Sequence, residues 1–365
     1  MVERSVGLVV VSHACVLAGN QEVYAALAAL GVPCDLIVPA RWRNEYQPGG
    51  FDAQEVAGLA GHVHRVRTIG QGRPQRHLAL ARCAAMLRTL GATTVLIEEE
   101  PFSLPAYVWS RAARHIGVPY GVQLAETLDR TLPVVVRRST GSVLRHAAFV
   151  AARSPKAAAL ARRWGATGEV LVVPHSVAAV AARDEPTGQF TVAFVGRLVD
   201  DKGVGDLLEA IALLRGDVRL LVAGDGPLAP SVRAAGAEVT LLGPVRHDRI
   251  GDVYGAAHVT CVPSRTTPSW EEQFGRVIVE SLIRGVPVIA SSSGEIPWVL
   301  SRTGGGTLVA ERDPQALADA IRAAAADREA TSKQGRLGRT GAVGAFSNEA
   351  VAAELATALA ALTQR

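Results

Sequence analysis

Apolar runs of strand length alternate with alanine-rich helical segments along the chain, and this alternation begins twice. In the first half, residues 6–12, 32–38 and 94–97 are continuously apolar or nearly so, as expected of parallel strands buried on both faces. Further runs of this kind lie at residues 118–122, 149–151 and 170–173. A helix at residues 22–30 follows a polar turn at Gly19 and Asn20 and ends at Gly31. This order predicts a parallel sheet covered by helices on both faces.

A polar segment at residues 178–189, which contains Pro186 and Gly188, interrupts the alternation and is interpreted as a linker. The pattern then restarts with a strand at residues 190–195 and a helix at residues 207–214. Later strands are predicted at residues 219–223, 239–242, 258–262, 286–290 and 307–309, and a last helix at residues 349–362. A chain of 365 residues is long enough for two domains. We therefore expect an α/β protein with two doubly wound, Rossmann-like domains facing a cleft, where ligands bind at the carboxyl ends of strands.

The composition excludes several classes of function. The chain is 48% hydrophobic and 20% charged, which is typical of a well-packed soluble protein. Its formal net charge is only +4, its basic residues are scattered and aromatic residues make up 5%, so nucleic acid is not an expected partner. No apolar run approaches the ~18 residues of a membrane-spanning helix, and residues 1–12 lack the features of a signal peptide. We expect a cytoplasmic protein whose contact with a membrane is at most peripheral.

The four cysteines are widely separated in the sequence and form no Cys-x-x-Cys pair. Each has apolar neighbours, so buried free thiols in a reducing compartment are expected. The cysteines are Cys15, Cys34, Cys83 and Cys261.

Two basic residues follow the strand at residues 190–195 directly. Gly196 permits a tight turn there, and Arg197 and Lys202 can reach one anion from the same loop. The chain contains only three lysines, so a lysine at this position is itself notable. Two solvated loop charges are the alternative interpretation.

The segment at residues 269–281 places two glutamates eight positions apart around a Phe-Gly turn. A helix is predicted to begin near Gly275, and the N–H groups of Phe274, Gly275 and Arg276 form a phosphate site at its N-terminus. Glu280 then lies about 7–8 Å along the helix, roughly the reach from a diphosphate to its ribose. Glu272 precedes the helix and can face a sugar. Ordinary surface acids are the alternative, which fits Glu280 poorly because its neighbours are apolar.

Other clusters leave alternatives open. Glu98, Glu99 and Glu100 follow a strand and form either a carboxylate site or a solvated turn. His62 and His64 share one face of a strand, but no third ligand is nearby, so a metal site is not favoured. A basic tract on the first domain faces either an anionic partner or solvent; it consists of Arg137, Arg138, Arg145, Arg153, Lys156, Arg162 and Arg163.

These motifs, in this order, resemble the landmarks of retaining glycosyltransferases of family 4, which have the GT-B fold. The similarity covers residues 190–310 and includes the segments 196–203, 224–227, 243–245, 263–264, 272–280, 285–289 and 294–297. The resemblance implies domains at residues 1–178 and 188–342 that bind acceptor and nucleotide sugar respectively, and a C-terminal segment 343–365 whose helix packs back on the first domain.

The resemblance also implies roles for individual residues. Arg197 and Lys202 would hold the diphosphate, Glu280 the ribose, and Glu272 with the Phe274–Gly275 backbone the donor sugar. Arg197, Lys202 and Glu272 are the predicted catalytic residues, and the donor site also includes Gly19, Gly196, Val245 and Arg276. In the first half the resemblance is weaker: the loop at residues 12–20 offers only Gly19 where the family has a glycine-rich loop, and Gln123 stands where many members have histidine. Candidates on the acceptor side are Glu100, Gln123 and Glu126.

The expected reaction is transfer of a sugar from a nucleotide diphosphate donor to an unidentified acceptor, without a cofactor or metal. Asp200 and Asp201 resemble a metal-binding pair, but they follow a phosphate-binding arginine in a loop whose family counterparts need no metal. A nucleotide-sugar epimerase or a phosphorylase of the same fold remains an alternative. A dinucleotide-dependent enzyme is disfavoured, because no Gly-x-Gly-x-x-Gly follows residues 6–12.

Overall fold

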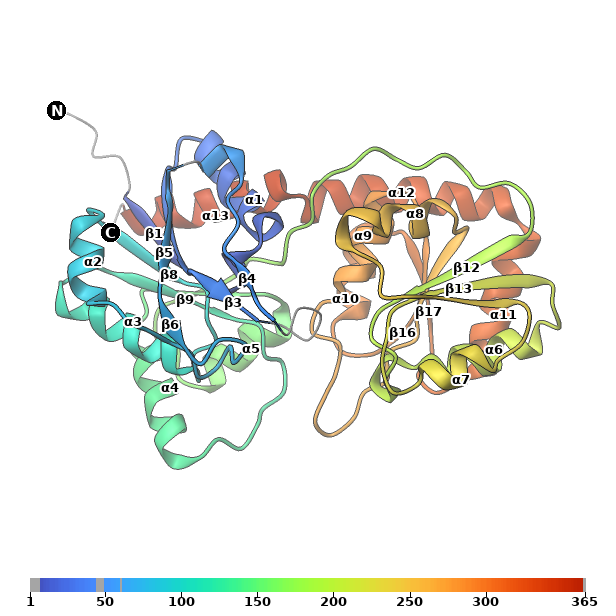
Figure 1. Ribbon diagram of the computed structural model, residues 1–365, viewed down its shortest axis with the longest axis horizontal. Helices are drawn as coiled ribbons and strands as arrows, with labels where there is room; N and C mark the ends of the chain where they lie inside the picture. The colour runs from blue at the N-terminus through green and yellow to red at the C-terminus, as the bar shows by residue number, and fades with distance from the viewer. Residues whose placement is uncertain (1–6, 44–48, 60, 364–365) are drawn as a thin grey trace. The chain divides into compact units, whose positions relative to one another are not determined.

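The computed structural model describes residues 7–43, 49–59 and 61–363. The chain divides into two compact units, which are taken in turn below (Figure 1). The first unit combines residues 1–178 with residues 348–365, and the second consists of residues 179–347.

The first unit is built on a parallel sheet that has seven strands in its described residues. Their spatial order is β11-β10-β9-β8-β1-β2-β5. The strands are β1 Leu8–Val11, β2 Cys34–Pro39, β5 Val63–Val66, β8 Thr94–Ile97, β9 Tyr120–Leu124, β10 Phe149–Ala152 and β11 Glu169–Val172. Leu8 in β1 is in register with Cys34 on one side and Thr94 on the other. The strand order therefore reverses at β1, which makes the carboxyl ends of β1 and β8 the switch point where ligands of such sheets bind.

Helices cover both faces of this sheet and enclose two apolar cores. The helices are α1 Ala18–Ala29, α2 Cys83–Thr89, α3 Leu104–His115, α4 Val134–His146, α5 Pro155–Arg163 and α13 Asn348–Thr363. The C-terminal helix α13 lies against α1 (Figure 1), inserts Val351, Leu355 and Leu359 into one core, and bonds Asn348 Nδ2 to Glu22 Oε2 at 2.8 Å. Two small antiparallel hairpins extend from the sheet: β3 Arg41–Trp42 with β4 Phe51–Asp52, and β6 Thr68–Ile69 with β7 Leu78–Ala79.

The second unit repeats the design with six parallel strands among its described residues, in the order β14-β13-β12-β15-β16-β17. The strands are β12 Phe190–Val195, β13 Val218–Ala223, β14 Val239–Gly243, β15 Val259–Val262, β16 Val288–Ser291 and β17 Gly306–Val309. The helices are α6 Val204–Leu213, α7 Ala229–Arg233, α8 Ile250–Gly255, α9 Arg276–Ile283, α10 Ile296–Thr303, α11 Pro314–Ala326 and α12 Arg328–Phe346. Here the order reverses at β12, so the second switch point lies at the carboxyl ends of β12 and β15.

The predicted two-sheet α/β architecture is confirmed, and the predicted strands at residues 94–97 and 190–195 coincide with β8 and β12. The predicted turn at Gly19 and Asn20 is wrong, because α1 already begins at Ala18 and includes both. Asn20 Nδ2 donates to the Ala14 carbonyl at 2.8 Å, and the buried Gln21 donates to the Cys15 carbonyl at 2.7 Å. These side chains provide hydrogen-bond donors for two carbonyl groups of the preceding loop, which allows the helix to begin at Ala18.

Two further expectations concern the whole chain. The thiols of all four cysteines are free and buried, as predicted. Across residues 7–43, 49–59 and 61–363, no helix combines the length and the apolar character that crossing a membrane requires.

Candidate functional site

The loops that follow β12 and β15 pack closely at the switch point of the second unit. Gly203 has φ +68°, and a Cβ atom there would lie 1.8 Å from the carbonyl oxygen of Pro263. The N–H of Arg265 donates to the Asp201 carbonyl at 2.8 Å, which ties the same two loops together. Glycine is therefore required at position 203, because any side chain would separate the loops.

Lys202 and Glu272 form an ion pair at this position, with 2.6 Å between Nζ and Oε2. Ser264 Oγ donates to the same carboxylate oxygen at 3.1 Å, and the Lys202 ammonium lies 4.6 Å from the centre of the Trp270 ring. Glu272 Oε1 has no hydrogen-bond partner among the residues that the structure describes. The pair thus presents ammonium N–H groups for an anion and one carboxylate oxygen for a hydroxyl group.

The backbone that carries Glu272 is held by the loop before α10. Gly294 has φ +56°, and a Cβ atom there would lie 2.1 Å from the Glu272 carbonyl oxygen. The N–H of Glu295 donates to that same oxygen at 2.8 Å. Glu272 is consequently fixed through its backbone as well as its side chain.

Helix α9 begins at Arg276, one residue after the predicted start, and Gly275 is its N-cap with φ 76° and ψ 58°. Phe274 is buried and packs edge-to-face on Phe346, at 5.3 Å between ring centres, which anchors the turn. The first N–H groups of α9 thus have a fixed position and the partial positive charge of a helix N-terminus.

Glu280 lies about one helical turn after Arg276 in α9 and is buried. Its Oε1 accepts from Arg276 Nε at 3.0 Å, and its Oε2 accepts from the Tyr254 hydroxyl at 3.2 Å. Burial, together with the Glu280 carboxylate, raises the pKa of Tyr254 well above its ordinary value, so the phenol stays a donor. Sequence reasoning missed Tyr254, since it lies 26 positions from Glu280 and no motif includes it.

The remaining predicted donor residues of the second unit follow the carboxyl ends of β12 and β14. Arg197 is exposed, and its guanidinium has no ion pair or hydrogen bond to any described residue. Gly196 donates its N–H to the Ala223 carbonyl at 3.0 Å, and Val245 packs partly against the core beside β13. Gly19 belongs to the first unit, within α1.

At the switch point of the first unit, the three glutamates after β8 form a largely buried cluster. Glu98 pairs with Arg153, Glu99 bonds to His13, and Glu100 Oε1 accepts from the Ala125 N–H at 2.9 Å. The solvated-turn interpretation is therefore wrong. Burial raises the pKa of Glu100 to about 7, and its Oε2 is buried without a hydrogen-bond partner.

His13 and Glu99 form a two-point contact between the ends of β1 and β8. Glu99 accepts from the His13 backbone N–H at 2.9 Å and contacts Nδ1 at 2.7 Å, and only 1% of the Glu99 side chain is exposed. The rings of Trp42 and His77 lie 5.1 and 5.5 Å from that of His13. Burial lowers the pKa of His13, but the Glu99 carboxylate and its two neighbours outweigh burial and raise it overall. Nε2 has no partner within the described chain, so it can bond a ligand.

Gln123 and Glu126 flank this cluster. Gln123 lies within β9, because that strand extends to Leu124, and its Oε1 accepts from Arg153 at 2.5 Å. Arg153 is buried between Gln123 and Glu98, so it does not belong to a solvated basic face. Glu126 accepts from the N–H of the next residue at 3.0 Å and from Arg130 Nε at 2.6 Å.

His62 and His64 lie beside Asp35, at 3.2 and 2.7 Å from its Oδ1. Both imidazoles are within hydrogen-bonding distance of the same oxygen atom. In the part of the chain that the structure describes, no group of three or more His, Cys, Asp or Glu side chains could hold a metal ion.

Comparison with protein families identifies the chain. Residues 189–327 match the model of the glycosyl transferases group 1, and residues 18–175 match that of the glycosyl transferase 4-like domain. Each model matches less than half of the chain, and the two together indicate a glycosyltransferase of the family 4 type. The two matches cover most of both units.

Among curated proteins, the chain is similar to the D-inositol 3-phosphate glycosyltransferases of Mycobacterium tuberculosis and Mycobacterium bovis. The identity is 37% over 155 residues, which is 40% of this chain and 31% of the relatives. The matched part is thus about a third of the length of these relatives.

Two solved structures show the same fold over nearly the whole chain. Sucrose-phosphate synthase from Thermosynechococcus elongatus has a TM-score of 0.76 at 20% identity, covering 98% of this chain and 99% of the other. HepE from Anabaena in complex with UDP has a TM-score of 0.73 at 19% identity, covering 97% and 100%.

Proposed function

We propose that this protein is a retaining glycosyltransferase, which moves a sugar from a nucleoside diphosphate to an acceptor hydroxyl. The observation that supports this most is the Lys202–Glu272 pair, fixed at the switch point of the second unit. On the same loop as Lys202, the Arg197 guanidinium has no partner among the described residues. Cationic donors and an open carboxylate oxygen in one loop cluster suit a diphosphate and a sugar.

The leaving diphosphate would be held by positive groups. The Arg197 guanidinium has no partner in the described chain, and Lys202 uses one of its three N–H donors to bond Glu272. The N–H groups at the start of α9 can receive further phosphate oxygens. We propose that these groups stabilise the charge that develops on the diphosphate, so that transfer needs no metal or cofactor.

The carboxylates would recognise the rest of the donor. Glu272 Oε1 is available to accept from a sugar hydroxyl, while Lys202 and Ser264 hold Oε2. Glu280, oriented by Arg276 and Tyr254, would accept from the ribose hydroxyls with its remaining lone pairs.

The first unit would bind the acceptor. We propose that the free Nε2 of His13, oriented by Glu99, contacts the acceptor hydroxyl. We propose that Glu100, Gln123 and Glu126 also lie on the acceptor side. In the transfer step the acceptor oxygen bonds to the anomeric carbon as the bond from that carbon to phosphate oxygen breaks. The acceptor proton passes to the departing diphosphate, and the configuration is retained.

One solved structure supports a nucleotide-sugar donor, and the curated relatives support glycosyl transfer. HepE from Anabaena was solved in complex with UDP and with UDP-glucose, and it has the same fold. The D-inositol 3-phosphate glycosyltransferases share 37% of residues with the matched segment. The buried free thiols favour a reducing compartment, in which we place the reaction.

Product analysis tests this function. The protein is incubated with nucleotide sugars, with and without a panel of hydroxyl acceptors, and the products are followed by proton NMR. The proposal predicts an acceptor-dependent glycoside with the anomeric configuration of the donor. An inverted product would contradict retention. A change of the donor without acceptor would indicate an epimerase, and a requirement for inorganic phosphate a phosphorylase.

A further inference from the structure

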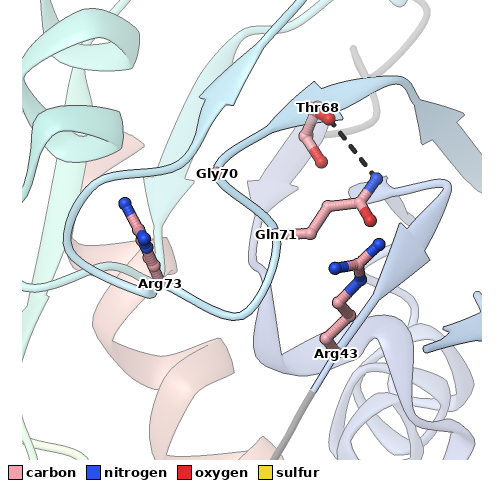
Figure 2. Close-up of a pocket in the computed structure, with 5 residues that line it drawn as sticks. All are labelled: Arg43, Thr68, Gly70, Gln71 and Arg73. Atoms are coloured by element: carbon pink, nitrogen blue, oxygen red, sulfur yellow. Dashed lines mark hydrogen bonds between the residues drawn. The ribbon is translucent and has the colours of Figure 1, made fainter. Parts of the chain in front are cut away.

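A hollow of about 300 Å³ opens between the two small hairpins of the first unit. Figure 2 shows the five residues that line it: Arg43, Thr68, Gly70, Gln71 and Arg73. None of them is acidic, and none was singled out by the sequence motifs. The volume suffices for a group of small-molecule size.

The lining offers several hydrogen-bond donors that the folded chain leaves unused. The guanidinium groups of Arg43 and Arg73 make no ion pair or hydrogen bond to the described residues, whereas that of Arg41 on the same hairpin pairs with Asp52. Thr68 is 8% exposed, and its hydroxyl oxygen is buried without a partner among the described residues. An unpaired buried hydroxyl is costly, so a bound group that hydrogen-bonds with it would be stabilised.

The loop that forms one wall of the hollow is held in place. Gly70 and Gly72 have φ +73° and +79°, which glycine adopts without strain. A Cβ atom on Gly72 would lie 3.3 Å from the Arg43 Cβ, so this loop and the β3 hairpin are in contact. Gln71 Nε2 donates to the Thr68 carbonyl at 3.4 Å, the bond drawn in Figure 2.

The hollow is joined to the His13–Glu99 cluster by short connections. Arg43 follows Trp42, whose ring lies 5.1 Å from that of His13. The Arg73 carbonyl accepts from the His77 N–H at 3.0 Å, and His77 Nε2 lies 3.6 Å from Glu99. The residues that line the hollow are thus held by the same side chains that surround His13 and Glu99.

We propose that this hollow binds an oxyanion, a phosphate monoester or carboxylate, carried by the sugar acceptor. Guanidinium groups suit such anions because they donate parallel hydrogen bonds, and the Thr68 hydroxyl and Gln71 amide add donors. That the oxyanion belongs to an acceptor rests on the proposed function; binding of the anion itself does not.

NMR of the full-length, isotope-labelled protein tests the site with inorganic phosphate and, separately, acetate as probes. Both titrations are run with saturating UDP, so that the proposed donor site is occupied. We expect saturable shifts of the Gly70 and Gln71 signals, and the probe that binds more tightly identifies the preferred oxyanion. Arg43→Gln and Arg73→Gln should each weaken binding by about tenfold or more, the usual effect of a lost charge-assisted bond.

Two variants separate this site from simpler explanations. Arg76→Gln is the matched control, since Arg76 is also exposed, its guanidinium has no partner in the described chain, and it does not line the hollow. Thr68→Val should weaken phosphate binding without lowering thermal stability, because it removes an unpaired polar atom.

Three results would overturn the inference: absent saturation, equal weakening by Arg76→Gln, or an unchanged affinity in Thr68→Val and both pocket arginine variants. The thermal response to UDP, recorded in the same samples, reports the second unit separately. If UDP gives no thermal response, the proposed donor site is contradicted. The phosphate titration then still tests whether the hollow binds an anion.

Discussion

Replacing Lys202 by methionine removes the ammonium while keeping an apolar stem over Trp270, so it isolates the charge. The Lys202 and Glu272 side chains are 23% and 12% exposed, which places the pair between surface and buried ion pairs. Breaking it should lower the free energy of unfolding by about 1–2 kcal/mol. A domain with the usual stability of about 5–15 kcal/mol stays folded after such a loss.

The expected loss of turnover is much larger than the loss of stability. An electrostatic donor aimed at a developing anion is typically worth a factor of about 10²–10³ in kcat. Release of nucleoside diphosphate from the nucleotide sugar measures turnover, and chemical denaturation measures stability. Lys333→Met is the matched control, because Lys333 is an exposed lysine on α12 without a partner in the described chain.

The double variant Lys202→Met with Glu272→Gln separates structure from function. It removes the carboxylate that Lys202→Met leaves unpaired, so stability should return while turnover stays low. If turnover recovers together with stability, Lys202 has only a structural role. Turnover of Lys202→Met within about threefold of wild type would also refute the reasoning.

Three further changes have defined outcomes. Folding raises the pKa of Glu100 from 4.5 to about 7, so the ionised carboxyl group lowers the stability of the protein as pH rises between these values. Glu100→Gln should therefore stabilise the protein above pH 7 by up to about 3 kcal/mol and have no effect below about pH 4.5. By NMR, His13 should titrate above 6.5 and lose this shift in Glu99→Gln; since its pKa is raised in the folded state, the pair's contribution to stability is full below 6.5 and declines as pH rises through the folded value. Gly294→Ala should weaken nucleotide-sugar binding, because its Cβ would displace the Glu272 carbonyl.

Each of these changes has a control or a contradicting result. Gly304→Ala matches Gly294→Ala, because Gly304 has φ +67° but its Cβ would approach only the Leu337 side chain, at 3.3 Å. Equal effects on binding would show that backbone strain, not the position of Glu272, is responsible. A stability difference between Glu100→Gln and wild type that does not change with pH would exclude a perturbed carboxyl group. An unchanged His13 titration in Glu99→Gln would remove Glu99 as the partner.

The sheet strands could be predicted from sequence because they are buried on both faces and leave continuous apolar runs, as at residues 94–97 and 190–195. The two-residue strands of the hairpins leave no such signal, and the oxyanion site that they form was not foreseen. The start of α1 was also missed, since the bonds of Asn20 and Gln21 to the preceding loop depend on the fold.

In the candidate site too, local features could be predicted from sequence and long-range contacts could not. The motif around Glu272 and Glu280 is local, so its spacing indicates a helix N-terminus between two carboxylates. The ion pair of Glu272 with Lys202 joins residues 70 positions apart, and that of Glu99 with His13 joins residues 86 apart. Contacts at such separations are set by the order of strands in the sheets, which no local pattern encodes. For the same reason, the choice between a carboxylate site and a solvated turn at Glu98, Glu99 and Glu100 required the structure.

Thermal stabilisation of the purified protein by UDP, GDP, dTDP, ADP and NAD, each alone, tests the central claim most directly. A ligand at a hundred times its dissociation constant adds about 2.7 kcal/mol to stability, which gives a readily measured shift. The account predicts a clear shift with at least one nucleoside diphosphate, and its reduction in Lys202→Met but not in Lys333→Met. A shift with NAD and none with any nucleoside diphosphate would contradict it.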